Sequence, residues 1–289
     1  MTPTTRAWLQ IHFCVLLWGF TAILGRVITL PALGLVWWRM LIVATAMVFV
    51  RRFWKGLGVL PGRMIPVYAG IGALVATHWL LFYSAIKLAN ASVAATSMAL
   101  TPVFTALLEP PLVGRRFDVR EILFGMGVIP GVLLVVGGTP ELMRMGIAAG
   151  VGAAAAAAVF SSLNKRYVED ADPATVTGLE MAAGAVWLGL ISALPGTDAV
   201  FVVPEGRDIG YLLLLALGCT LLPYVLALVA LRRLSAFSTN LAVNMEPVYA
   251  IILAIVLLGE QHELAPRFYL GVLIILAAVF SYPLLRTRS

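Results

Sequence analysis

Ionisable side chains inside the apolar stretches of this sequence are the first candidates for chemistry. Near the centre of a membrane-spanning helix such a group costs about 2.5–3.5 kcal/mol, so it is usually kept for pairing or for function. Six such groups, inside apolar runs or at their ends, are the main candidates. They are Arg39, His78, Glu180 and Glu246, with Lys87 and Glu109 at the ends.

Glu246 stands directly before Pro247 in one of these runs. Proline lacks a backbone donor and frees the carbonyl four residues earlier. Glu246 can therefore be a partner for a substrate ammonium group, a proton-carrying group, or a structural carboxylate at a kink. Asn240 and Asn244 share one helix face, whereas Glu246 points about 200° away from Asn244. We expect the asparagines to face a cavity, with helix–helix hydrogen bonding as the alternative.

A histidine and several aromatic residues form a second group of candidates. His78 can bind a carboxylate or change its charge near neutral pH. Trp79 and Tyr83 share a helix face and can stack on an aromatic ligand, or they can face lipid instead. Tyr224, which follows a proline, and Trp187 are weaker candidates.

Small polar side chains recur every four residues at Ser97, Thr101 and Thr105, and Glu109 continues the stripe. Such a stripe can line a water-filled path, or it can serve close packing between helices. For Glu109 we expect an ion pair at the inner surface, because Arg115 follows shortly after it.

The composition indicates a membrane protein. Of the 289 residues, 61% are hydrophobic and 12% are charged, against about 25% charged in soluble domains. Continuous apolar runs in lipid must be helices, because the backbone has to satisfy its own hydrogen bonds. No zinc or disulfide spacing occurs, nor any phosphate-binding loop or nucleophile elbow. We therefore expect no metal, no cofactor, no ATP-driven step and no enzyme.

Ten apolar segments of about 17–23 residues are long enough to cross a bilayer. With the N-terminus inside, the inner loops and ends hold 14 Lys and Arg residues and the outer ones hold five. This bias places both termini in the cytoplasm. The predicted spans lie at about 7–25, 33–50, 64–86, 91–109, 121–137, 146–164, 174–194, 209–231, 237–258 and 268–285.

The chain repeats itself at an offset of 145 residues. Segment 90–115 aligns with 235–260, which places Pro102 on Pro247 and Gly114 on Gly259. The two prolines break the fourth and ninth spans at matching depths. We expect them to be flex points.

Each half of the chain, 1–140 and 141–289, holds five predicted spans. Because five is odd, two similar halves insert in opposite directions, and such inverted repeats are typical of secondary transporters. Arg39 and Glu180 lie at matching depths in the paired second and seventh spans. We expect both to anchor helix interfaces near the outer surface.

These runs resemble the two copies of the EamA repeat, from the drug/metabolite transporter superfamily, over essentially the whole chain. The first copy departs from the pattern, because Arg115 stands where Gly-Glu is usual after Gly114. The resemblance implies ten helices in a basket, cytoplasmic termini and export of small metabolites. Within the family the chain is similar to the YddG-type exporters of aromatic amino acids. The resemblance rests on Trp18-Gly19, Arg39, Glu246-Pro247 and Gly259-Glu260, within the runs AIKLANASVAATSMALTPVFTALLEPPLVG and ALRRLSAFSTNLAVNMEPVYAIILAIVLLGE.

Together these features predict a secondary transporter of a bacterial inner membrane that exports amphipathic metabolites, amino acids above all, by alternating access. Its mainly neutral cavity would be lined by spans 1, 3, 4, 6, 8 and 9. Carriers of nucleotide sugars, phosphorylated sugars or drugs are alternatives, as is a passive channel, although a phosphate cargo calls for clustered Lys or Arg. The partners expected are the substrate and the lipid bilayer, without nucleic acid, and the sequence does not indicate an oligomeric state.

Overall fold

The computed structural model of the chain is helical throughout the part that it describes, which comprises residues 3–195, 197, 202–235, 239, 242–243 and 245–286. Short 3-10 turns connect some of the helices. The first half holds α1 Pro3–Val27, α2 Ala32–Val48, α3 Arg51–Val59, α4 Ile65–Leu88, α5 Ala91–Met98, α6 Thr101–Val113 and α7 Val119–Gly138. The second half holds α8 Arg144–Tyr167, α9 Pro173–Ser192, α10 Arg207–Leu213, a π-helix Leu214–Leu221, α11 Leu222–Leu231, α13 Met245–Leu253, a π-helix Ala254–Leu258 and α14 Pro266–Arg286.

Seven helices in the described part are long and apolar enough to cross a membrane, and an eighth is counted if α2 and α3 are taken as one broken span. The last two predicted spans appear there as shorter apolar helices, Met245–Leu258 and Pro266–Ala278. A polytopic helical membrane protein is therefore confirmed. Ten crossings remain a prediction.

The basic stretch after the second span is a helix, which corrects its interpretation as a loop. α3 bends by 84° from α2 and packs its Phe53 ring against Gly178 of α9. Arg52 at the start of α3 pairs with Asp172, with Nε 2.7 Å from Oδ2. Since Trp54 is exposed beside the basic residues, α3 has the character of a helix that lies along a membrane surface.

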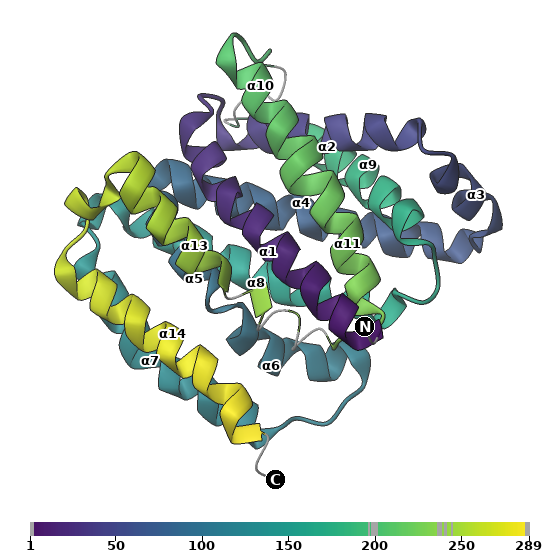
Figure 1. Ribbon diagram of the computed structural model, residues 1–289. Coiled ribbons are helices and arrows are strands. Elements are labelled where there is room, and N and C mark those ends of the chain that lie inside the picture. Colours follow the sequence, from purple (N-terminus) through teal and green to yellow (C-terminus); the bar gives the residue numbers. More distant parts are fainter. Residues whose placement is uncertain are drawn as a thin grey trace.

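The contacts between helices follow a two-fold pattern. α4 packs against α8 as α11 packs against α1, and α6 packs against α8 as α13 packs against α1. The pairs α2–α9 and α7–α14 each join equivalent helices. Figure 1 shows α7 and α14 side by side at one edge of the bundle. A two-fold relation between the halves produces this set of contacts.

The repeat also extends to the backbone at two glycines. Gly114 ends α6 and Gly259 ends the π-helix Ala254–Leu258, both in the left-handed conformation, with φ of 76° and 69°. Side chains rarely adopt this conformation, and a glycine there commonly terminates a helix. The same residue type therefore ends equivalent segments of the two halves.

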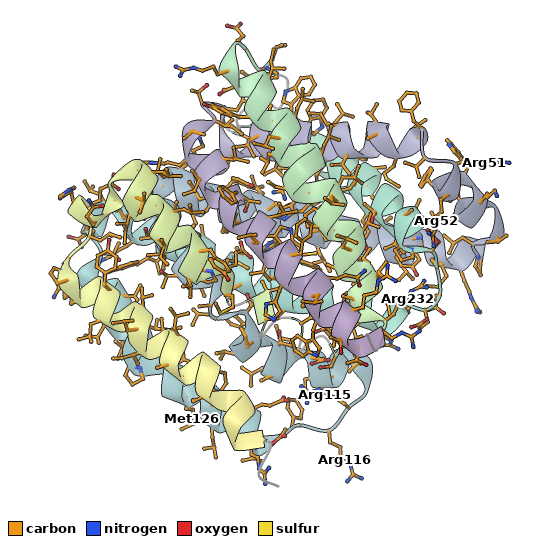
Figure 2. The ribbon with its side chains drawn as sticks, viewed as in Figure 1. Arg51, Arg52, Arg115, Arg116, Met126 and Arg232 are labelled. Carbon is orange, nitrogen blue, oxygen red and sulfur yellow. The ribbon has the colours of Figure 1, made fainter. Side chains whose placement is uncertain are left out.

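The arginines expected on the inner side gather on one side of the molecule. Figure 2 shows Arg51 and Arg52 near α3, Arg232 after α11, and Arg115 and Arg116 after α6 on this common side. The helix ends that carry them therefore face the same way.

Candidate functional site

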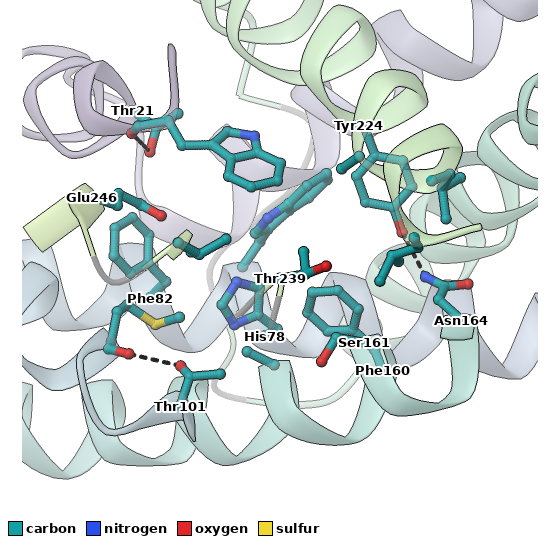
Figure 3. Close-up of a pocket in the computed structure, with 18 of the residues that line it drawn as sticks. Thr21, His78, Phe82, Thr101, Phe160, Ser161, Asn164, Tyr224, Thr239 and Glu246 are labelled. Carbon is teal, nitrogen blue, oxygen red and sulfur yellow. Dashed lines mark hydrogen bonds between the residues drawn. The ribbon is translucent and has the colours of Figure 1, made fainter. Parts of the chain in front are cut away.

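A cavity of about 120 Å³ lies between the two halves of the chain (Figure 3). All six spans expected to line it contribute, through α1, α4, α5–α6, α8, α11 and α13, and α2 adds Arg39. Arg39, His78 and Glu246 are the lining groups that can carry charge. The aromatic part of the wall comes from Trp18, Trp79, Phe82, Phe160 and Tyr224.

Arg39 lines this cavity, which the sequence did not predict, and it also joins helices as expected. Its guanidinium carbon lies 3.7 Å from the centroid of the Trp79 ring, in a cation–π contact. Nη1 donates to the Tyr83 hydroxyl at 2.9 Å, and Nε donates to Thr220 Oγ1 at 2.6 Å. Three contacts thus fix the guanidinium at the wall. Its position along the span gave no indication of which face it occupies.

Thr220 holds Arg39 from the π-helix Leu214–Leu221, where the backbone makes wider turns. Its own hydroxyl donates to the Leu215 carbonyl at 2.5 Å while it accepts from Arg39. Pro223 follows this segment at the start of α11. π-helical turns often occur at functional sites, but α-helical periodicity gives no sign of one.

His78 lies on the cavity wall between two phenylalanine rings (Figure 3). Its ring centroid is 6.3 Å from that of Phe82 and 5.3 Å from that of Phe160. Nδ1 is 2.9 Å from the Ala153 carbonyl oxygen, which can only accept, so Nδ1 carries a proton. In the neutral ring, Nε2 is then an acceptor.

Glu246 lines the cavity at the same end as Thr21 (Figure 3). This corrects the expectation that Glu246 points away from the cavity. The asparagines predicted for the cavity, Asn240 and Asn244, lie outside the described residues.

Trp79, Thr101 and Tyr224 line the cavity as expected, but Tyr83 and Ser97 do not. Tyr83 is fully buried behind Arg39 and hydrogen-bonds to it. Ser97 packs against α8, where a Cβ on Gly150 would come 2.5 Å from Ser97 Oγ. The predicted role of Ser97 at the cavity is therefore wrong, and its alternative role in close packing holds.

The hydroxyls of the polar stripe are turned into their own helix. Ser97 donates to the Val93 carbonyl at 3.0 Å, and Thr105 donates to the Thr101 carbonyl at 2.9 Å. The stripe does not form a polar path along the cavity, because its member on the wall is Thr101, which donates to the Met98 carbonyl at 2.7 Å. Trp187, a weaker candidate, is 40% exposed and donates to Thr77 Oγ1.

The far end of the cavity is formed by Tyr224 and Asn164. Asn164 Nδ2 donates to the Tyr224 hydroxyl at 3.4 Å, as the dashed line in Figure 3 shows. The Tyr224 hydroxyl in turn donates to Glu180 Oε2. Glu180 therefore lies behind the cavity wall, at an interface of α9 with α11.

Several lining residues were not predicted from the sequence. Among them Asn164 carried a usable signal, because it is a polar residue near the end of an apolar run. Trp18 and Thr21 of α1, and Phe160 and Ser161 of α8, are unremarkable in sequence and are brought to the wall by packing.

Comparison with known proteins gives the family. The profile of the EamA-like transporter family matches the chain twice, over residues 6–137 and 144–282. The chain belongs to this family. It is therefore a multi-pass membrane secondary transporter of the drug/metabolite transporter superfamily, and it is not an enzyme.

One solved crystal structure, titled only "Crystal structure of protein", resembles this EamA transporter in fold. The similarity covers 98% of this chain and 99% of that chain, with a TM-score of 0.67 and 20% sequence identity. No curated protein matches the sequence.

Pro102 of this EamA transporter stands in the first turn of α6. α5 ends at Met98 and α6 begins at Thr101, so the fourth span is interrupted directly before Pro102. Pro247 lies in α13, Met245–Leu253. A proline is tolerated in the first turn because that backbone donor has no partner within the helix.

Within the described part of the transporter, no three His, Cys, Asp or Glu side chains come close enough together to hold a metal ion.

Proposed function

We propose that this transporter exports small amphipathic metabolites, with aromatic amino acids as its main substrates, as YddG-type exporters do. The observation that carries the proposal is that Arg39 and Glu246 line one cavity with aromatic walls. Arg39 suits the carboxylate of an amino acid and Glu246 suits its ammonium group. The rings of Trp18, Phe82 and Phe160 suit an aromatic side chain.

Other residues that line the cavity are proposed to bind the substrate as well. His78, Trp79, Thr101 and Tyr224 contact the substrate in this proposal, and Asn240 and Asn244 join them from the ninth span. Tyr83 contributes by holding Arg39.

Transport proceeds by alternating access between two inverted repeats, 1–140 and 141–289. The two-fold pattern of helix contacts supports this arrangement, and the boundary falls between the two stretches that match the family. Pro102 and Pro247 serve as flex points. Glu246, predicted as a coupling or hinge residue, acts on the substrate ammonium group in this proposal.

The orientation has both termini in the cytoplasm and the chain in a bacterial inner membrane. The common side of Arg51, Arg52, Arg115, Arg116 and Arg232 supports this placement.

A phosphorylated cargo, such as a nucleotide sugar or a sugar phosphate, fits the cavity less well. Phosphate recognition favours clustered Lys and Arg side chains, and the described lining has Arg39 as its one basic residue besides His78. A passive channel is the other alternative, and it differs from a carrier in kinetics.

Reconstitution into liposomes tests the proposal. Radiolabelled phenylalanine, tyrosine, tryptophan and small neutral amino acids are compared in counterflow, with and without a pH gradient. We expect saturable counterflow that is fastest for the aromatic amino acids. Uptake without counterflow would indicate a channel, and no movement of any amino acid would overturn the substrate class.

Variants then connect transport to the cavity. We expect His78→Ala and Asn244→Ala to impair transport at normal membrane expression. Trp187→Phe is the matched control, because Trp187 is exposed rather than on the cavity wall. Near-normal rates for the first two variants would remove those residues from the site.

A further inference from the structure

Glu180 of α9 is a fully buried carboxylate that has no cation beside it. Its side chain is 0% exposed. Oε2 accepts from the Tyr224 hydroxyl, while Oε1 has no hydrogen-bond partner among the described residues. No ion pair found in the described part of the chain includes Glu180.

The four other carboxylates that are buried in the described residues are compensated, and this makes Glu180 distinct. Asp208 accepts hydrogen bonds from Thr29 N and Thr29 Oγ1. Glu109 and Glu121 share the guanidinium of Arg115. Glu260 accepts three hydrogen bonds at the N-terminus of α5. An uncompensated buried charge is strongly unfavourable, and a buried group with no cation usually becomes neutral by taking up a proton.

The cluster formed by Glu180, Tyr224 and Asn164 lacks a hydrogen-bond donor. Asn164 Oδ1 is also buried without a partner, although Asn164 Nδ2 donates to the Tyr224 hydroxyl. Two acceptor oxygens, one on Glu180 and one on Asn164, are thus unsatisfied. A proton on the Glu180 carboxyl removes the charge and adds the missing donor. A metal ion fits poorly, because Glu180 is the cluster's only acidic side chain and no metal-binding group of three was found in the described residues.

The cluster opens on the substrate cavity. Tyr224 and Asn164 line the cavity wall (Figure 3). Glu180 lies directly behind the Tyr224 hydroxyl, which donates a hydrogen bond to it. We propose that Glu180 is a proton-binding site, which exchanges its proton with water in the cavity through Tyr224 and Asn164 and so couples transport to a pH gradient. An O–H bond forms on the carboxyl as hydronium gives up its proton, and the reverse step returns the proton to water. The coupling rests on the proposed function, whereas the proton site does not.

The helices packed against α9 place few other charges towards this cluster. On α2 the guanidinium of Arg39 is held by Tyr83, Thr220 and Trp79. The basic residues of α3 are exposed. The titratable or charged groups of the neighbouring elements are Arg39 of α2, Arg51, Arg52 and Lys55 of α3, Tyr68, His78, Tyr83 and Lys87 of α4, and Tyr224 of α11; Lys87 donates to the Ile28 carbonyl.

The titratable side chains of α4 are already engaged. The Tyr68 hydroxyl donates to the Tyr167 carbonyl at 2.9 Å, and His78 Nδ1 is bonded to Ala153 O. Neither therefore supplies the missing donor to Glu180, which leaves the proton.

Glu180 also occupies the closest approach of two helices. A Cβ on Gly72 of α4 would lie 2.3 Å from Glu180 O and 2.7 Å from Glu180 Cα, so the backbones of α4 and α9 touch at this residue. A change of charge there acts on the seam between a cavity-lining helix and its neighbour. This is where a proton can bias the alternation between two states.

Infrared difference spectroscopy tests the proton site without any substrate. The full chain in lipid nanodiscs is titrated with acid, and the C=O stretch of protonated carboxyl groups is followed. We expect a carboxyl band that is present in the wild type and in Glu141→Gln, and lost in Glu180→Gln. A spectrum of Glu180→Gln identical to the wild type, or loss of the band in Glu246→Gln instead, would overturn the assignment.

If Glu180→Gln does not fold, a second variant still tests the proton site. Tyr224→Phe removes a donor to the carboxylate, so the transition of the band moves to higher pH by about one unit or more. An unmoved transition would contradict the proposal.

Coupling is measured in liposomes that contain a pH-sensitive dye. With a phenylalanine gradient, the wild type moves protons, whereas Glu180→Gln exchanges phenylalanine in counterflow without moving protons. Proton movement by Glu180→Gln would contradict the coupling role. If the wild type carries no phenylalanine, the proposed substrate fails and the infrared result alone decides whether Glu180 binds the proton.

Discussion

Glu260 and Arg115 stand at equivalent positions of the two repeats, 145 residues apart, yet they make opposite contacts. Glu260 is fully buried and accepts from Ala91 N at 3.0 Å, Ser92 N at 2.8 Å and Ser92 Oγ at 2.7 Å. It thereby caps the N-terminus of α5, where a negative charge is favoured. Arg115 lies between carboxylates instead. Equivalent positions in the two repeats therefore stabilise the fold by different interactions, a helix cap at Glu260 and ion pairs at Arg115.

Removal of the Glu260 carboxylate is expected to destabilise the fold. In Glu260→Ala the donors of Ala91 and Ser92 lose their acceptor while they remain buried, at a cost of about 3–5 kcal/mol. Thermal unfolding in detergent micelles measures the loss. Glu141→Ala is the control, because Glu141 forms an exposed pair with Arg144 and its loss costs less than about 1 kcal/mol. Equal melting temperatures for the two variants would contradict the role of Glu260 as a cap.

Arg115 neutralises two carboxylates, and we expect its removal to make the stability of the fold depend on pH. Its Nη2 lies 3.3 Å from Glu109 Oε2 and 2.7 Å from Glu121 Oε2, so both carboxylates meet at one nitrogen. Partial burial works against the charge of Arg115, but the hydrogen bonds and charges of Glu121 and Glu109 outweigh it and raise the pKa of Arg115. The guanidinium is what allows two carboxylates to lie so close together.

In Arg115→Gln the two carboxylates lose the guanidinium that lies between them, so the folded protein binds a proton more tightly than the unfolded chain does. Its stability therefore falls as pH rises. We expect a loss of about 1–3 kcal/mol at neutral pH that shrinks as pH falls towards the range where carboxyls ordinarily titrate, near about 4. Melting temperatures across pH measure this. The exposed Arg116→Gln is the control, and a pH-independent loss in Arg115→Gln would argue against the explanation.

Arg39 is expected to set affinity through its geometry as well as its charge. Arg39→Lys keeps a cation, but one ammonium cannot reproduce the stacking on Trp79 together with the bonds to Tyr83 and Thr220. A loss of about 1.5–3 kcal/mol corresponds to roughly a 10–100-fold rise in KM for phenylalanine in proteoliposomes, and Arg39→Ala is expected to bind more weakly still. The exposed Arg144→Gln should match the wild type. An unchanged KM in Arg39→Lys would remove Arg39 from substrate binding.

Much of the fold could be predicted from sequence because lipid leaves few choices for an apolar run. The repeat was visible through Pro102 and Pro247, and Gly114 and Gly259 share their left-handed backbone as well as their place in the alignment. α3 could not be distinguished from a loop by its basic residues. Its place is set by Phe53, which packs into the space left by Gly178 on α9.

The cavity was harder to predict because helical periodicity fixes which residues share a face, but not which face meets a partner. Trp79 and Tyr83 do share a face, yet Arg39 inserts at this point, so Trp79 reaches the cavity and Tyr83 does not. Thr220 acts through a π-helix that no α-helical pattern indicates. Glu180 reaches the cavity only through Tyr224, a contact between residues 44 apart in the chain.

The contact of α4 with α9 offers a test in which two glycines of one helix behave oppositely. A Cβ on Gly72 would lie 2.3 Å from the Glu180 backbone oxygen, whereas a Cβ on Gly70 would meet nothing within 4 Å. In Gly70→Ala the added methyl group favours the helix, so stability stays the same or rises by up to about 1 kcal/mol.

In Gly72→Ala the backbones of α4 and α9 must separate, because backbone atoms cannot rotate away as a flexible side chain can. We expect this variant to lose about 3 kcal/mol or more in unfolding from detergent micelles, near or above the usual cost of overpacking. It should also alter transport more than Gly70→Ala does, because α4 carries His78 and Trp79 on the cavity wall. Equal stability of the two variants would mean that α4 and α9 do not touch at Glu180. The close helix contact on which the proton of Glu180 is proposed to act would then not exist.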